Sequence, residues 1–212
     1  MYDYYSRTPA NRDRGVDPYN ATVRLDRGIE AARMLRVTAL LGIATRLFYI
    51  YASANRISVT HTLLGLLNAN GQIDLSGQPD GGGNVLAQAH DADTLVTTAL
   101  VASVIALILF VLALISVARR KKRGDAFAET IDRNRAIRLA SRSYVVVVVA
   151  STIARNAFNA GADASPTDRL HTLLDTDTAT IGLQVAVIAI LLVYTLAIGR
   201  EIGKARAAGR IG

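Results

Sequence analysis

Long apolar runs dominate the pattern of hydrophobic and polar positions along this chain. Residues 95–117 and 179–199 contain no charged side chain, and their apolar residues cover every face rather than recurring at the spacing of a soluble helix or strand. At a rise of 1.5 Å per residue, a helix of either length crosses the roughly 30 Å of hydrocarbon in a bilayer. The pattern therefore predicts two transmembrane helices.

Two less apolar segments, residues 37–55 and 143–162, each contain one charged residue, Arg46 and Arg155 respectively. The second segment includes the run VVVVV, which in a soluble protein is also typical of a buried strand. An open strand in lipid leaves its backbone polar groups unpaired, so a helix is favoured. Four transmembrane helices are predicted; the alternative is two spans with two buried or re-entrant segments.

Basic residues are unevenly distributed between the segments outside these spans. Of the 24 lysines and arginines, 20 lie in residues 1–36, 118–142 and 200–212, whereas residues 56–94 and 163–178 hold eight aspartates and two arginines. Basic residues near span ends remain in the cytoplasm. We therefore expect an integral membrane protein, of a bacterial-type plasma membrane, with both termini and the central linker in the cytoplasm.

The densest basic run directly follows the second apolar span. It consists of Arg119, Arg120, Lys121, Lys122 and Arg123. A basic patch can bind nucleic acid. Because this one adjoins a span end, a topology signal that also contacts anionic lipid headgroups is favoured, and no nucleic-acid partner is expected.

Polar residues in the two halves of the chain match in the same order. Arg46 corresponds to Arg155, the sequence HTLL occurs at residues 61–64 and 171–174, and D-x-D-T occurs at residues 91–94 and 175–178. One insertion in the first half accounts for the change of offset. We therefore predict a tandem duplication of a two-helix hairpin, whose copies are related by a pseudo-twofold axis along the membrane normal.

The predicted fold is all-α: an integral membrane four-helix bundle of two tandem hairpins, with short amphipathic helices at the interface. HTLL is expected on short helices at the outer surface, and Ser165, Pro166 and Asp168 form a typical helix start. The predicted order is a polar cytoplasmic tail at 1–23, a first hairpin at 24–117 (spans 37–55 and 95–117, with an inserted outer loop at about 65–90), a basic linker and second hairpin at 118–199 (spans 143–162 and 179–199), and a basic tail at 200–212.

Arg46 and Arg155 are the most informative polar residues. An arginine at the centre of a span costs roughly 2.5–3.5 kcal/mol on insertion scales, and neither 95–117 nor 179–199 offers an acidic partner. One hypothesis is a structural lock, in which the arginines snorkel or pair with aspartates at the starts of those spans. The other is that both face a cavity and bind an anion, a lipid phosphate or the carboxylate of a partner.

A second polar group is expected on the outer face. Histidines and carboxylates can hold a metal ion, but the spacings here match no metal motif. Aspartates at helix N-termini are favoured by capping and by the helix dipole, so capping is predicted, without metal or cofactor. The residues are His61, His90, Asp91, Asp93, His171, Asp175 and Asp177.

No nucleophile motif, cysteine or intramembrane carboxylate indicates catalysis, so an enzyme is not expected. The leading hypothesis is an accessory, scaffold or assembly subunit that contacts lipids and other membrane-protein subunits, or further copies of itself. The alternative is a small oligomeric channel or transporter for an anion, which uses Arg46 and Arg155.

Overall fold

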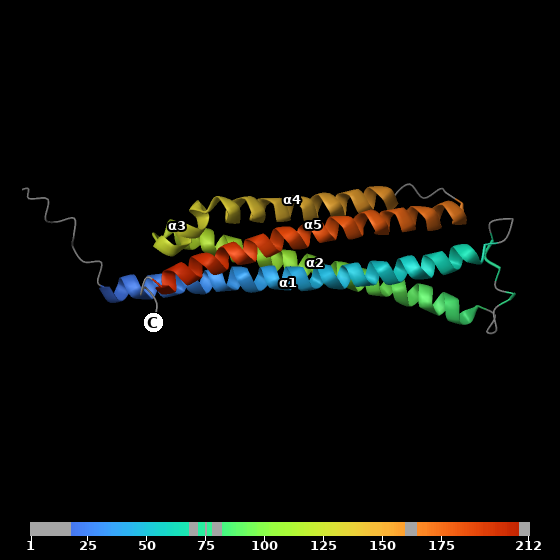
Figure 1. Cartoon of the computed structure of the whole chain (residues 1–212), viewed down its shortest axis with the longest axis horizontal. Coiled ribbons are helices and arrows are strands. Elements are labelled where there is room, and N and C mark those ends of the chain that lie inside the picture. The colour runs from blue at the N-terminus through green and yellow to red at the C-terminus, as the bar shows by residue number, and fades with distance from the viewer. Residues whose placement is uncertain (1–17, 68–71, 75, 78–81, 160–164, 208–212) are drawn as a thin grey trace, which may run out of the picture.

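The computed structural model describes residues 18–67, 72–74, 76–77, 82–159 and 165–207, without the side chains of residues 18–27, 154–159 and 166. Its described part consists of helices and one isolated antiparallel bridge between Leu67 and Ile73. The helices are α1 (Pro18–Gly65), α2 (Gly83–Lys122), α3 (Ala126–Arg133), α4 (Arg135–Asn159) and α5 (Pro166–Ala207) (Figure 1).

Four of these helices are long and apolar enough to cross a membrane, as the hydropathy pattern predicts. The candidate spans lie in Gly28–Gly65, Gly83–Lys122, Arg135–Ile153 and Thr167–Ala207. The valine run is helical and lies within α4, so the strand interpretation of that run is wrong. Four apolar helices of this length indicate an integral membrane protein.

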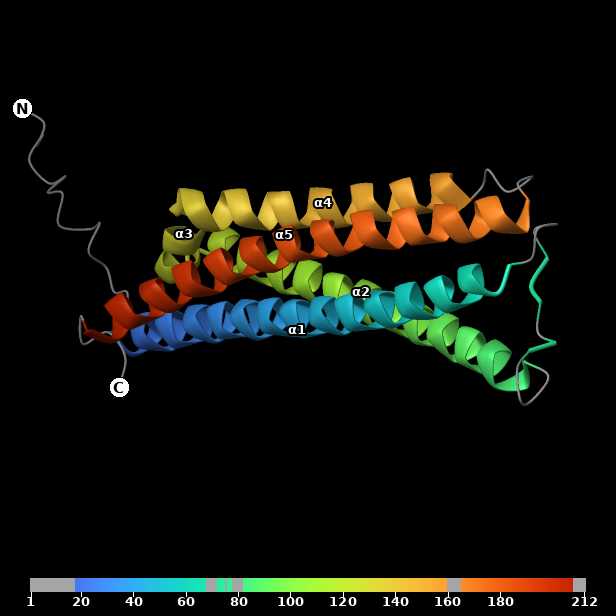
Figure 2. The same cartoon turned by 45° about the vertical axis from the view of Figure 1, so that its right-hand side comes forward.

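Helices α1 and α5 lie side by side and run in opposite directions (Figures 1 and 2). Helix α2 packs on α1, and α4 packs on α5. The short helix α3 joins α2 to α4 and contacts α1 as well. Phe110 of α2 packs edge-on against Tyr144 of α4, with ring centroids 4.9 Å apart, and against Tyr194 of α5, with ring centroids 5.2 Å apart.

The buried face of α2 follows a seven-residue repeat that its uniformly apolar sequence hides. Alanine recurs on this face every seven positions along the chain, and one other buried residue lies between each two successive alanines. Small residues allow two helices to approach closely, and a seven-residue repeat favours a left-handed crossing. The buried positions are Ala92, Val96, Ala99, Ser103, Ala106, Phe110, Ala113 and Val117.

Capping side chains define where two of the helices begin. At the start of α5, Ser165 Oγ accepts a hydrogen bond from the Asp168 backbone N at 3.2 Å and donates one to Asp168 Oδ2 at 2.6 Å, which confirms the predicted start. Asp125 caps α3 by accepting from the backbone N of Phe127 and Ala128, each at 3.0 Å. Gly124, with a φ of 80°, supplies the left-handed turn between α2 and α3.

Several predicted boundaries shift because the helices continue beyond the apolar runs. Helix α1 extends to Gly65 and α2 begins at Gly83, so His90 is helical rather than part of a loop. The prediction of separate short helices for HTLL is wrong, since one copy ends α1 and the other lies within α5. The amphipathic segment before the first span is likewise continuous with α1.

If the hairpin is duplicated, matched motifs should lie on corresponding helices of the two halves. In two tandem hairpins α1 corresponds to α4, and α2 corresponds to α5. The two HTLL copies lie on α1 and α5, which are not counterparts, so their match does not support a duplication. Arg46 and Arg155 lie on α1 and α4, and the D-x-D-T copies lie on α2 and α5, as counterparts should.

Candidate functional site

The buried face of α1 changes from apolar to polar about halfway along the helix. Its first part buries Ala32, Leu35, Ala39 and Gly42. The next residues at the same alternating spacing of three and four are Arg46, Tyr49, Ser53, Arg56 and Thr60, each at most 8% exposed. These five residues, here called the polar seam, lie where α1 packs against α2 and α5.

Arg56 joins three helices through ion pairs. Its Nε donates to Asp177 Oδ2 of α5 at 2.7 Å, and its Nη2 donates to Asp177 Oδ1 at 2.5 Å. Its Nη1 donates to Asp93 Oδ1 of α2 at 3.0 Å. The Asp177 side chain is only 2% exposed, whereas that of Asp93 is 70% exposed. The bidentate ion pair with Asp177 is therefore buried, whereas the ion pair with Asp93 is exposed to solvent.

Arg46 has a much weaker partner deeper in the bundle. Its Nη1 donates to the amide Oε1 of Gln184 of α5 at 3.0 Å. Both residues are 3% exposed. The Nε and Nη2 atoms of Arg46 are buried and have no hydrogen-bond partner in the described part of the chain. Because Gln184 is neutral, its amide does not compensate the charge of Arg46.

The environment of Arg46 differs from the aspartate-bound form of the predicted structural lock. Arg46 pairs with an amide rather than with an aspartate at a span start, so that form of the lock is wrong for Arg46. Arg155 is in α4, and its side chain lies outside the described residues. The aspartates bind Arg56 instead, one of the two arginines in the aspartate-rich segments outside the predicted spans. Its spacing from Arg46, with Tyr49 and Ser53 between, is the sequence signal that identifies it.

The predicted capping role of the outer-face aspartates is wrong, because they lie well inside α2 and α5 rather than at their ends. Two of them, Asp93 and Asp177, bind Arg56. No three histidine or carboxylate side chains gather into a possible metal site in the described ranges. The remaining members of that group are exposed helical residues: His61, His90, Asp91, His171 and Asp175.

The basic run occupies the last turn of α2 and the residue after it. Lys121 donates from Nζ to Asp132 Oδ2 of α3 at 2.5 Å, and this hydrogen bond lowers the pKa of Asp132 below its usual value. Lys122 is exposed. Arg119, Arg120 and Arg123 border an open hollow of about 480 Å³ on the surface of α2, beside Leu112, Ile115 and Ser116. Apolar and cationic side chains thus adjoin along one face.

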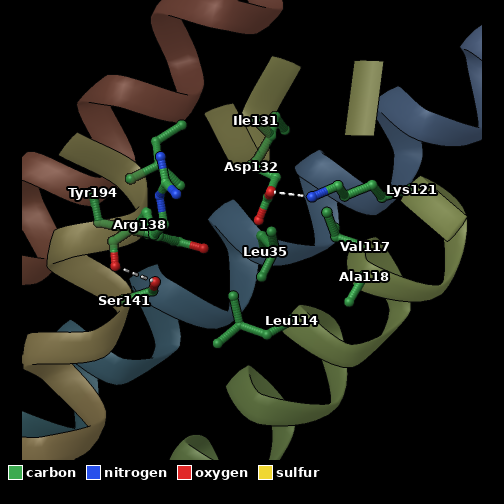
Figure 3. Close-up of a pocket in the computed structure, with 11 residues that line it drawn as sticks. Leu35, Leu114, Val117, Ala118, Lys121, Ile131, Asp132, Arg138, Ser141 and Tyr194 are labelled. Carbon is green, nitrogen blue, oxygen red and sulfur yellow. Dashed lines mark hydrogen bonds and ion pairs between the residues drawn. The ribbon is translucent and has the colours of Figure 1, made fainter. Parts of the chain in front are cut away.

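A smaller cavity of about 80 Å³ lies beside α3 (Figure 3). Apolar side chains such as Leu35 and Leu114 line one part of it, and Lys121, Asp132 and Arg138 line another. Ser141 uses its hydroxyl to donate to the Arg138 carbonyl at 3.0 Å. This cavity holds a few water molecules at most, and it contains no pairing of a nucleophile with a base.

Comparison of the chain with protein-family models, with curated proteins and with solved structures found no match.

Proposed function

We propose that this protein is an accessory, scaffold or assembly subunit of a larger membrane complex, in a plasma membrane with both termini in the cytoplasm. One observation carries the proposal: the buried charged residue Arg56 is bound to Asp177 and Asp93 and so holds α1, α2 and α5 together. The guanidinium donors of Arg56 bind carboxylates of neighbouring helices and are therefore not available to a substrate. A helical bundle with an apolar exterior is what such a subunit presents to lipids and to neighbouring helices.

Each of the four long helices exposes large apolar side chains. On α2 these follow one continuous face, and α4 carries a similar row. Large apolar surfaces of this kind are typical of contact with lipid or with the helices of a partner, because their exposure to water is unfavourable. Examples are Met34, Val37 and Tyr51 on α1, Val101 and Leu112 on α2, Leu139, Val146 and Ile153 on α4, and Leu196 on α5.

The hollow beside Arg119, Arg120 and Arg123 supports contact with anionic lipid. Leu112 and Ile115 present an apolar surface directly before the three guanidinium groups along α2. An acyl chain beside the former and a phosphate beside the latter match this order of side chains. Juxtamembrane basic residues each contribute on the order of 1 kcal/mol to binding an anionic surface.

The duplication remains part of this proposal. Asp93 and Asp177 occupy the same place in the two D-x-D-T copies, and both contact Arg56. A copied hairpin accounts for two equivalent aspartates that converge on one arginine, and it supports a pseudo-twofold relation between α2 and α5.

Extraction in mild detergent, purification through a terminal tag and mass spectrometry test the accessory role. We expect stoichiometric membrane subunits to co-purify. Tryptophan substitutions at Val146 on α4 and Leu196 on α5 separate partner contact from lipid contact, because a lipid-facing position tolerates the larger side chain. A monomer without partners from wild-type cells would contradict the proposal.

Anion passage through an oligomer is the second candidate, and the unpaired Nε and Nη2 of Arg46 favour it. Proteoliposomes with the wild-type protein should then show anion flux, and Arg46→Ala and Arg155→Ala should reduce it. Absence of flux from the wild-type protein would remove this candidate.

A further inference from the structure

Among the described residues, two buried polar side chains from different helices have donor atoms without a hydrogen-bond partner. Arg46 of α1 leaves Nε and Nη2 unpaired, and Ser103 of α2 leaves its hydroxyl unpaired. Arg46 is 3% exposed and Ser103 is 2% exposed. Buried polar atoms are almost always satisfied by protein, water or an ion. These atoms therefore indicate an occupant.

The ion pair between Arg56 and Asp93 establishes the register of α1 against α2 and puts Arg46 and Ser103 at the same level along these helices. Helices α1 and α2 run in opposite directions, and Arg56 contacts Asp93. Arg46 lies ten residues before Arg56, and Ser103 lies ten residues after Asp93, so both are about 15 Å along the axis from that contact. Gln184 of α5 bonds Arg46 from the third side.

Charge decides what kind of occupant fits. A guanidinium remains protonated in a protein, and an unpaired charge in a low-dielectric interior is costly. The apolar runs of α2 and α5, residues 95–117 and 179–199, contain no acidic residue to balance it. Water satisfies hydrogen bonds but leaves the charge in place, whereas an anion does both.

We propose that a single small monovalent anion of the halide class binds between α1, α2 and α5, held by Nε and Nη2 of Arg46 and by the Ser103 hydroxyl. One positive charge calls for one negative charge. The near-complete burial of Arg46 excludes larger ligands such as a lipid phosphate or a partner's carboxylate. The anion is a structural counter-ion, so the proposal stands or falls independently of the accessory role and of anion flux.

Thermal unfolding of the purified full-length protein in detergent is the first test. At constant ionic strength, replacement of gluconate by chloride or bromide should raise the unfolding temperature in a saturable way. Arg46→Gln should abolish this dependence. Arg36→Gln is the matched control, because Arg36 is an exposed arginine on the same helix, and this variant should keep the dependence. Equal unfolding temperatures of the wild-type protein in all three salts would overturn the proposal.

Ser103→Ala gives a second test that does not depend on the folding of an Arg46 variant. A hydrogen bond to a charged group contributes about 1.5–3 kcal/mol, so its loss should raise the half-saturating bromide concentration about tenfold or more. Without an anion, removal of an unpaired hydroxyl leaves the salt response unchanged, and that result would contradict the proposal.

Bromide also locates the site directly. Crystals of the wild-type protein grown in bromide should show an anomalous peak within hydrogen-bonding distance of the Arg46 guanidinium. An ordered water there, without anomalous signal at saturating bromide, would overturn the assignment of an anion.

Discussion

Arg56 and Asp177 form a two-pronged ion pair inside the bundle, although they lie 121 positions apart in the sequence. The pair joins the C-terminal part of α1 to the N-terminal part of α5, two helices that pack against each other. It therefore connects the two predicted hairpins to each other.

Asp177→Asn should destabilise the bundle much more than Asp93→Asn. Removal of one partner of a buried pair leaves an uncompensated charge and costs roughly 3–5 kcal/mol, whereas an exposed pair contributes about 0.2–1 kcal/mol. The Asp177 side chain is 2% exposed and that of Asp93 is 70% exposed. Thermal or denaturant unfolding in detergent measures both, and equal effects would contradict the distinction between the buried and the exposed ion pair.

Gly28→Ala should disturb the attachment of α3 to α1. A methyl group on Gly28 meets the carboxylate of Asp125, whose Oδ1 caps α3. The cap is worth about 1 kcal/mol, so a loss of that order is expected. Faster amide hydrogen exchange at Phe127 and Ala128 would show it.

Gly203→Ala serves as the control for that substitution. Nothing lies within 4 Å of a methyl group placed there, and alanine favours a helix over glycine, so no loss of stability is expected. An equal loss in both variants would indicate a general effect of the substitution rather than the contact with Asp125.

The contact between Lys121 and Asp132 should depend on pH in the acidic range. The hydrogen bond from Lys121 lowers the pKa of Asp132 below 3.8, so the contact stabilises the folded state above that pH and is lost as the pH falls through the lower, folded-state pKa. Both side chains are partly exposed, so the contribution is below about 1 kcal/mol. The difference in unfolding temperature between wild type and Asp132→Asn should be present at pH 6 and vanish at low pH; a difference that grows with acid would contradict the assignment.

Replacement of Arg119, Arg120 and Arg123 by glutamine should reduce the retention of anionic lipid. The matched control replaces three exposed arginines elsewhere, Arg33, Arg36 and Arg206, and so changes the net charge equally. Native mass spectrometry of both variants, purified with a mixture of anionic and zwitterionic lipid, compares the bound lipids. Equal retention would show that net charge alone, rather than the hollow on α2, binds the lipid.

Single cysteines should label from opposite sides of the membrane. The chain has no cysteine, and Gly77→Cys and Thr130→Cys place one in the loop between α1 and α2 and one on α3. If the basic linker is cytoplasmic, a membrane-impermeant reagent reaches residue 77 in intact cells but residue 130 only after permeabilisation. The reverse pattern would invert the proposed topology.

Hydropathy alone was sufficient to predict the four long helices. Lipid requires apolar side chains on every exposed face of a span, and that requirement leaves a continuous signal whichever way the helices pack. The helix start at Ser165 and Asp168 was also predictable, because a helix start depends on residues close together in the sequence.

The partners of Arg46 and Arg56 could not be predicted in the same way. Hydropathy does not distinguish the faces of a helix that is apolar all round, and it does not show that α1 continues as a helix to Gly65. Only the packing of α1 against α2 and α5 brings Asp93 and Asp177 to Arg56 and leaves Gln184 beside Arg46. These contacts depend on the relative register of helices distant in sequence, which tertiary packing alone determines.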